Sequence, residues 1–209
     1  MYKKIIAKGY DRVYEKFIAK YGTLSESEKE YLDEFLELVR GPKILDIGCG
    51  PGKHSKYMKE KGYEVYSADI SGKMVLSTKQ INPYTLYADM EYLPFREEYF
   101  DGIWCNAALV HLPKKDKALS EFYRVLKDEG ILYVSVQNLL YPRILKILFS
   151  SILHGNLRQL YYREVYWWPE TGFNLKKLLR KHNFHIIKGS GSLNKWVRYY
   201  ARKNSKKAE

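Results

Sequence analysis

The sequence contains few cysteines and no long apolar run, and both shortages limit what the protein can be. Its two cysteines, Cys49 and Cys105, are too few for a disulfide framework or a cysteine-based zinc site. This usage suits a reducing cytoplasm, so we expect a cytoplasmic protein with no bound metal. No segment approaches the roughly 18 apolar residues of a membrane span, since the most apolar stretch, residues 144–153, contains Lys146. The N-terminus also lacks the apolar core and cleavage site of a signal peptide.

Acidic residues are scarce in the last third of the chain. Residues 1–138 carry 21 basic residues (Lys and Arg) and 21 acidic residues (Asp and Glu). Residues 139–209 carry 15 basic residues and only 3 acidic ones. The second stretch therefore accounts for the whole formal net charge of +12. It also holds Trp167, Trp168 and Trp196. A basic, aromatic segment is typical of RNA binding, although solvated lysines in a heat-adapted protein would give the same composition.

Apolar periodicity predicts alternating helices and strands. Helical spacing covers residues 10–21 and 26–39, and Ser25 is suited to cap the second helix. Further helices are expected at 54–61, 72–80, 114–126, 142–153 and 175–182, and strands at 43–48, 64–70, 85–89, 101–109, 131–138, 185–190 and 195–203. Strands that alternate with helices indicate an α/β fold whose parallel sheet is covered on both faces.

A glycine-rich loop follows the first predicted strand. Residues 44–53, ILDIGCGPGK, place a glycine at every second position after a strand that contains Asp46. Glycine permits positive φ and a close backbone approach to a ligand. A P-loop would need Ser or Thr after Lys53, where His54 stands, and a dinucleotide loop would need a small residue at position 53. Asp46 would repel a diphosphate but suits a ligand with an ammonium or sulfonium group, which favours S-adenosylmethionine (SAM).

Acidic residues also follow the next two predicted strands. Asp69 lies 23 residues after Asp46, where a carboxylate can accept both hydroxyls of a ribose. Asp89 can accept from an adenine amino group, and Met90 can pack on the adenine ring. Because the carboxyl ends of parallel strands share one edge of the sheet, we expect these residues to meet at the glycine loop.

Together these motifs resemble the class I SAM-dependent methyltransferases in their small single-domain form. The resemblance spans residues 10–138 and includes LDIGCGPG, YSADIS, ADMEYLPFREEYFD, ALVHL and EFYRVLKDEGILYVSV. It implies a Rossmann-like, mostly parallel seven-stranded sheet and an enzyme that converts SAM to S-adenosylhomocysteine. The implied cofactor contacts are Tyr10, Asp46, Gly48, Cys49, Gly50, Gly52, Asp69, Ile70, Asp89, Met90, Asn106 and Ala107. In the family pattern the glycines line the methionine part, Asn106 or Ala107 lies near the sulfonium, and Tyr10 closes the pocket.

We predict a single domain with two parts. Residues 1–138 would form N-terminal helices and the SAM-binding core. Residues 139–209 would complete the sheet, and their inserted helix at 142–153 would cap the acceptor. His111 is the candidate general base at the predicted rim, and the alternative for it is a structural role.

The basic part points first to RNA as the acceptor. QINPYTLYADMEYLPFREEYFD, LYYREVYWW and LKKLLRKHNF are similar to the eukaryotic and archaeal tRNA wobble-uridine methyltransferases. That similarity implies tRNA as substrate and a small zinc-binding protein as activator. Two alternatives remain open. One is a small-molecule or lipid-like acceptor beneath an amphipathic lid at residues 141–153, with Trp167 and Trp168 in its wall. The other is a cofactor-binding subunit without catalysis.

Overall fold

The computed structural model describes residues 2–146, 161–162, 165–166, 168–190 and 194–205. Its helices are α1 (Tyr2–Tyr21), α2 (Glu26–Leu38), α3 (Lys53–Glu60), α4 (Gly72–Lys79), α5 (Asp116–Val125), α7 (Gly172–Lys181) and the short 3-10 helix η1 (Leu109–His111). Its strands are β1 (Lys43–Ile47), β2 (Glu64–Asp69), β3 (Thr85–Tyr87), β4 (Phe100–Asn106), β5 (Leu126–Gln137), β6 (Tyr161–Tyr162), β7 (Val165–Tyr166), β8 (Phe184–Ser190) and β9 (Trp196–Lys203).

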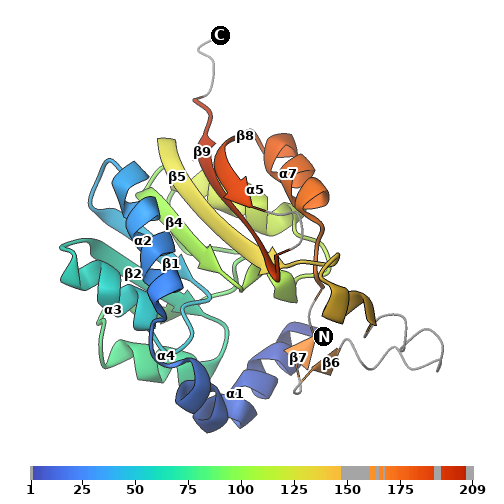
Figure 1. Ribbon diagram of the computed structural model, residues 1–209. Coiled ribbons are helices and arrows are strands. Elements are labelled where there is room, and N and C mark those ends of the chain that lie inside the picture. Colours follow the sequence, from blue (N-terminus) through green and yellow to red (C-terminus); the bar gives the residue numbers. More distant parts are fainter. Residues whose placement is uncertain (1, 147–160, 163–164, 167, 191–193, 206–209) are drawn as a thin grey trace.

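The main sheet has seven strands in the order β3-β2-β1-β4-β5-β9-β8 (Figure 1). β1, β2, β3, β4 and β5 pair in parallel, whereas β9 is antiparallel to both of its neighbours. β6 and β7 form a separate two-stranded hairpin. The predicted Rossmann-like, mostly parallel seven-stranded sheet is confirmed. β8 and β9 complete it, while the division at residue 138 stays a prediction.

Helices cover both faces of the sheet. α2 and α3 pack on one face, where Phe35 and Met58 belong to the same buried apolar cluster as Trp104 and Tyr133 of the sheet. α5 and α7 cover the other face through a larger cluster. These helices bury apolar side chains at helical spacing, which is why the periodicity of the sequence located them.

α1 begins eight residues earlier than the periodicity predicts. Gly9 destabilises a helix by ~1 kcal/mol relative to alanine. A prediction from local periodicity therefore begins the helix only after this residue. Tyr2 donates a hydrogen bond to Glu91, and Lys3 bonds the side chain of Asp89. These tertiary contacts stabilise the first turns of the helix.

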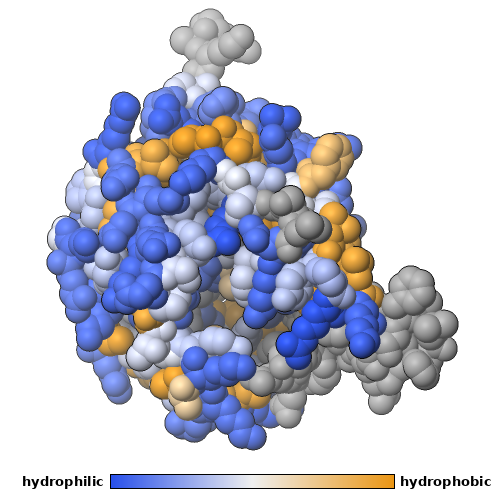
Figure 2. Space-filling model, in the orientation of Figure 1, coloured by the Kyte–Doolittle hydropathy of each residue, from blue (hydrophilic) through white to orange (hydrophobic). Residues whose placement is uncertain are grey.

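The edge at which β1, β2, β4 and β5 end is crossed by α1. This helix contacts α4 on one side and β7 on the other, and Figure 1 shows it set apart beneath the strand ends. Figure 2 shows the surface hollowed in this region, between α1, α2 and the strand ends. The fold therefore places the predicted ligand residues around an opening that α1 partly covers.

Two sequence-based predictions lie partly beyond the described structure. Residues 142–146 are helical and bury Ile144, but the rest of the predicted helix at 142–153 lies outside the described residues, as does Trp167. Within the residues that the structure describes, no helix is both long and apolar enough to cross a membrane.

Candidate functional site

The glycine loop adopts a backbone that other residues would strain. Gly48, Gly50 and Gly52 have φ values of 71°, 53° and 87°, a region that L-residues with a Cβ rarely adopt. A Cβ on Gly48 would also collide with the Cβ of Ala108. The amides of Gly48 and Cys49 donate to the carbonyl of Ala68 at 2.7 and 3.1 Å. The loop is therefore held against the end of β2 and presents bare backbone to the hollow, which fits the methionine side of a bound SAM.

Asp69 lies at the end of β2 and closes this loop. Its Oδ2 accepts from the amide of Gly50 and its Oδ1 from the amide of Ser71, both at 2.9 Å. The side chain is buried, and burial raises its pKa to about 6 although the backbone donors act in the opposite direction. The next residue, Ile70, is partly exposed at the same tip. A carboxylate with two backbone donors in place is well oriented to accept the ribose hydroxyls of SAM.

Asp46 lies one layer deeper than its neighbours in the predicted site. It is 1% exposed, and its Oδ2 accepts from the hydroxyl of Ser55 at 2.6 Å. Burial raises its pKa. The structure thus places Asp46 beneath the loop and not at its surface, so it would act on a cationic ligand through its charge. As a cofactor contact it stays a prediction, and so does Cys49, whose thiol is buried.

Asp89 and Met90 follow β3, and the start of α1 covers them. The ammonium of Lys3 bonds the carboxylates of both Asp89 and Glu91. The amide of Glu91 donates to Asp89 Oδ1 at 2.9 Å. Met90 is partly buried against the larger apolar cluster. This arrangement encloses the place where the sequence predicts the adenine.

Tyr10 and His111 meet although 101 residues separate them in sequence. The hydroxyl of Tyr10 lies 2.8 Å from Nε2 of His111, and the two rings meet edge to face at 5.3 Å. Burial raises the pKa of Tyr10, so this hydroxyl keeps its proton. His111 could act as a base through Nε2 only after this contact opens. Its catalytic role therefore stays a prediction.

Asp11 fastens the middle of α1 to the rim. Its Oδ1 accepts from the hydroxyl of Ser71 at 2.6 Å and from the amide of Lys73 at 3.0 Å. Ser71 is the N-cap of α4, so Asp11 supplies a negative charge at the start of that helix, where the helix dipole favours it. The sequence predicted no role for Asp11, because its partners lie about 60 positions further along the chain.

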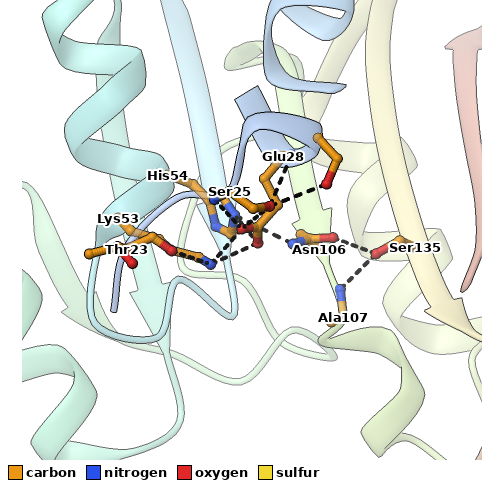
Figure 3. Close-up of polar contacts among 9 residues, drawn as sticks. Thr23, Ser25, Glu28, Lys53, His54, Asn106, Ala107 and Ser135 are labelled. Carbon is orange, nitrogen blue, oxygen red and sulfur yellow. Dashed lines mark hydrogen bonds and ion pairs between the residues drawn. The ribbon is translucent and has the colours of Figure 1, made fainter. Parts of the chain in front are cut away.

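A polar network lies where β4 and β5 end (Figure 3). Ala107 has a φ of 56°, which is uncommon for a residue with a Cβ and costs on the order of 1 kcal/mol. Its amide donates to the hydroxyl of Ser135 at 2.9 Å, and that hydroxyl donates to Oδ1 of Asn106 at 2.6 Å. Ser135 thus fixes both the strained backbone and the orientation of the Asn106 amide, whose Nδ2 lies 3.4 Å from Nε2 of His54.

The network continues to α2 through Glu28. Its Oε1 lies 3.4 Å from Nε2 of His54 and 2.7 Å from Nζ of Lys53. Burial would raise the pKa of Glu28, but the bonds from His54 and Lys53 outweigh it and hold the pKa well below its usual range. Lys53 also donates to the carbonyl of Thr23 at 3.2 Å. Lys53, the residue that departs from the dinucleotide pattern, therefore ties the α1–α2 connection to the glycine loop.

Glu28 and Ser135 were absent from the predicted site. A signal for Glu28 existed, since it stands three residues after Ser25 and completes a capping box. That signal predicts only a helix start. Ser135 is the single polar residue of the apolar run at residues 131–136, and only the pairing of β4 with β5 brings it to Asn106.

The comparisons with known proteins agree with this geometry. The profile of a family described as a methyltransferase domain matches residues 45–134, which contain the glycine loop and the ends of β2, β3 and β4. The chain belongs to the class I SAM-dependent methyltransferases. The cofactor of this family is SAM, and the glycine backbone and Asp69 carboxylate fit it.

Several curated relatives of this methyltransferase are named malonyl-[acyl-carrier protein] O-methyltransferase. The protein from Salmonella typhimurium is 33% identical over 163 residues, which are 76% of this chain and 57% of the relative. The protein from Buchnera aphidicola is 39% identical over 116 residues, or 54% of this chain and 41% of the relative. The chain thus spans about half the length of the curated relatives it matches.

A solved structure reproduces the fold of the methyltransferase over its whole length. It is the complex between the Trm112 methyltransferase activator and a methyltransferase of Haloferax volcanii. It has a TM-score of 0.75 and 14% sequence identity, and the match covers 98% of this chain and all of the other. Identity at this level shows the fold alone.

These findings change the expected acceptor. The sequence led first to tRNA, with a small-molecule or lipid-like acceptor as the alternative. The curated relatives act on an acyl group held by a carrier protein, so they favour the alternative and give no support to tRNA modification.

Proposed function

We propose that this methyltransferase transfers the methyl group of SAM to a carboxylate oxygen of an acyl chain held as a thioester, as in a malonyl group on an acyl carrier protein. One observation carries the proposal: the match to the Salmonella malonyl-[acyl-carrier protein] O-methyltransferase over 76% of the chain. The methyltransferase-domain profile matches residues 45–134, which include the glycine loop and the ends of β2, β3 and β4.

The polar groups of the site suit an acceptor that arrives already deprotonated. A carboxyl group is ionised at neutral pH, so its methylation needs no general base. His111 is engaged by Tyr10, and Asn106 and Ser135 are neutral hydrogen-bonding groups. What the site must supply is alignment of the acceptor with the methyl group and exclusion of water. α1 helps to exclude water, because it crosses the opening and is held there by contacts of Lys3, Tyr10 and Asp11.

The test incubates the full chain with SAM and malonyl-acyl carrier protein, malonyl-coenzyme A, acetyl-coenzyme A or tRNA, and identifies products by mass spectrometry. We expect a methyl ester on the malonyl thioesters and none on acetyl-coenzyme A, which has no free carboxylate. Methyl transfer to tRNA, or SAM binding without ester formation on either malonyl thioester, would contradict the proposal.

The same assay tests the expected activator protein. The Haloferax volcanii complex contains Trm112, and its methyltransferase shares this fold. We therefore propose to run the reaction with and without Trm112. A higher rate on addition would support an activator, and an unchanged rate would contradict one.

A further inference from the structure

Three buried polar atoms of side chains have no hydrogen-bond partner among the residues that the structure describes. They are Nε1 of Trp104, Oγ of Ser190 and Nε of Arg198. Buried polar groups are nearly always paired, and each exception needs an explanation such as an absent ligand. Trp104 is 1% exposed and lies between Tyr133 and His54, which keeps its N–H within the core. Ser190 and Arg198 are only partly buried as residues, although Oγ of Ser190 and Nε of Arg198 are themselves covered.

Ser190 and Arg198 stand in one row with the polar network of β4 and β5. Asn106 pairs with Ser135, Ser135 with Arg198, and Arg198 with Ser190. Residues paired directly across a sheet project to the same face. The row therefore runs from the rim of β4, where Ala107 and Asn106 lie, to β8. It lies on the face that α2 covers, since Arg198 contacts Tyr31 of that helix.

The guanidinium of Arg198 is held in place and makes no direct ion pair among the described residues, although its charge interacts with Glu34 at longer range. Its Cζ lies 3.9 Å from the centre of the Tyr31 ring, a stacking geometry that orients a guanidinium. No carboxylate of the described residues lies within ion-pair distance of it, and the nearby Glu34 bonds Lys188 at 2.7 Å instead. By contrast, Arg202 on the same strand pairs with Glu129 at 3.5 Å. Holding a half-buried cation with an unsatisfied hydrogen-bond donor in the folded protein costs free energy. A bound anion that pairs with it would offset this cost.

We propose that the guanidinium of Arg198 forms a subsite for the carboxylate of the acceptor. This inference rests on the proposed function and names the residue that selects its substrate. A guanidinium recognises a carboxylate through two parallel hydrogen bonds, which leaves lone pairs on the carboxylate oxygens free. β4, β5 and β9 are neighbours about 5 Å apart, so Arg198 begins about 10 Å from the strand that ends at Asn106. Its long side chain can span much of that distance.

The methyl transfer at this subsite needs only two reactants, the acceptor carboxylate and SAM. A carboxylate oxygen attacks the methyl carbon, and a C–O bond forms. The C–S bond breaks and its electron pair remains on sulfur. The products are a neutral methyl ester and the thioether S-adenosylhomocysteine, and no proton moves. Since the ester carries no charge, it would lose its attraction to Arg198 and leave the site.

The experiment measures binding of malonyl-coenzyme A and acetyl-coenzyme A to the full chain saturated with S-adenosylhomocysteine, by isothermal titration calorimetry. The two ligands differ at the acyl end only by the carboxylate. We expect the wild-type protein to bind malonyl-coenzyme A at least ~10-fold more tightly, as a charge-assisted hydrogen bond allows. Arg198→Gln should abolish this preference, and Arg198→Lys should restore part of it.

Arg202→Gln is the matched control, because it makes the same change on the same strand away from the rim. It should keep the wild-type preference, and all variants should bind S-adenosylhomocysteine as the wild type does, which excludes misfolding. A wild-type protein that binds both thioesters equally, or an Arg198→Gln variant that still prefers malonyl-coenzyme A, would overturn the subsite. A wild-type protein that shows the preference but forms no methyl ester would overturn the proposed function and leave the subsite standing.

Discussion

At the scale of single residues, Asp69 combines a structural role with a predicted ligand contact. Its carboxylate holds the glycine loop through Gly50 and the start of α4 through Ser71. It also lies where the sequence predicts the ribose of SAM. Its pKa is raised to about 6 because burial disfavours the charge. The ionised form that a ribose needs is therefore complete only above that pH.

We expect the affinity for S-adenosylhomocysteine to fall as the pH drops through about 6. The protonated carboxyl of the free protein must lose its proton before it can accept both hydroxyls, so each pH unit below the pKa weakens binding ~10-fold. Calorimetry between pH 5 and pH 7.5 would measure this. Asp69→Asn should bind weakly and nearly independently of pH over this range. A wild-type affinity that stays constant from pH 7.5 to pH 5 would refute the assignment.

At the scale of elements, α1 is the part whose position matters most for the site. Its contacts reach three places on the rim: Asp89 after β3, His111 in η1 and Ser71 at the start of α4. Asp89 is itself a predicted ligand contact, and Ser71 directly follows another, Ile70. We therefore propose that α1 acts as a lid over the bound ligand, with these contacts as its attachments to the rim.

Asp11→Ala should speed the release of S-adenosylhomocysteine several-fold, because it removes the acceptor for Ser71 and for the Lys73 amide. Stopped-flow displacement would measure the dissociation rate. Glu15→Ala is the matched control, since Glu15 is exposed one turn further along α1. Equal dissociation rates for the two variants would show that this fastening does not restrain the ligand.

At the scale of the whole molecule, Lys115 joins the two parts of the chain. It is 2% exposed and donates to the carbonyls of Leu112 and Trp168 and to the carboxylate of Glu170, at 3.0 to 3.3 Å. The amide of Trp168 in turn donates to the carbonyl of Val110 at 2.6 Å. The loop after β4 and the segment before α7 are thereby held together beside the opening.

Lys115→Ala should lower the free energy of unfolding by about 2–3 kcal/mol, because two carbonyls and one carboxylate lose a buried charged donor. Urea denaturation followed by circular dichroism would measure the loss. Lys114→Ala changes the exposed neighbour and should stay within ~0.5 kcal/mol of the wild type. Similar values for both variants would show that the buried lysine does not stabilise the fold.

The sequence by itself determined the order of the elements, the glycine loop and the acids that follow β2 and β3. These features depend on short-range rules of periodicity and turn chemistry, which act within a few residues. The same rules misplaced the start of α1, and the basic composition of the last third led first to RNA as the acceptor, which the curated relatives do not support.

Only the tertiary structure decided which distant residues meet. Lys3 reaches Asp89 across 86 positions, and Tyr10 reaches His111 across 101. Strand register alone brings Ser135 beside Asn106 and Arg198. Such contacts follow from the order in which the strands pair, and no local pattern records that order. The sequence therefore specified the candidate site for the methyl donor, while the fold assembled the side that we propose faces the acceptor.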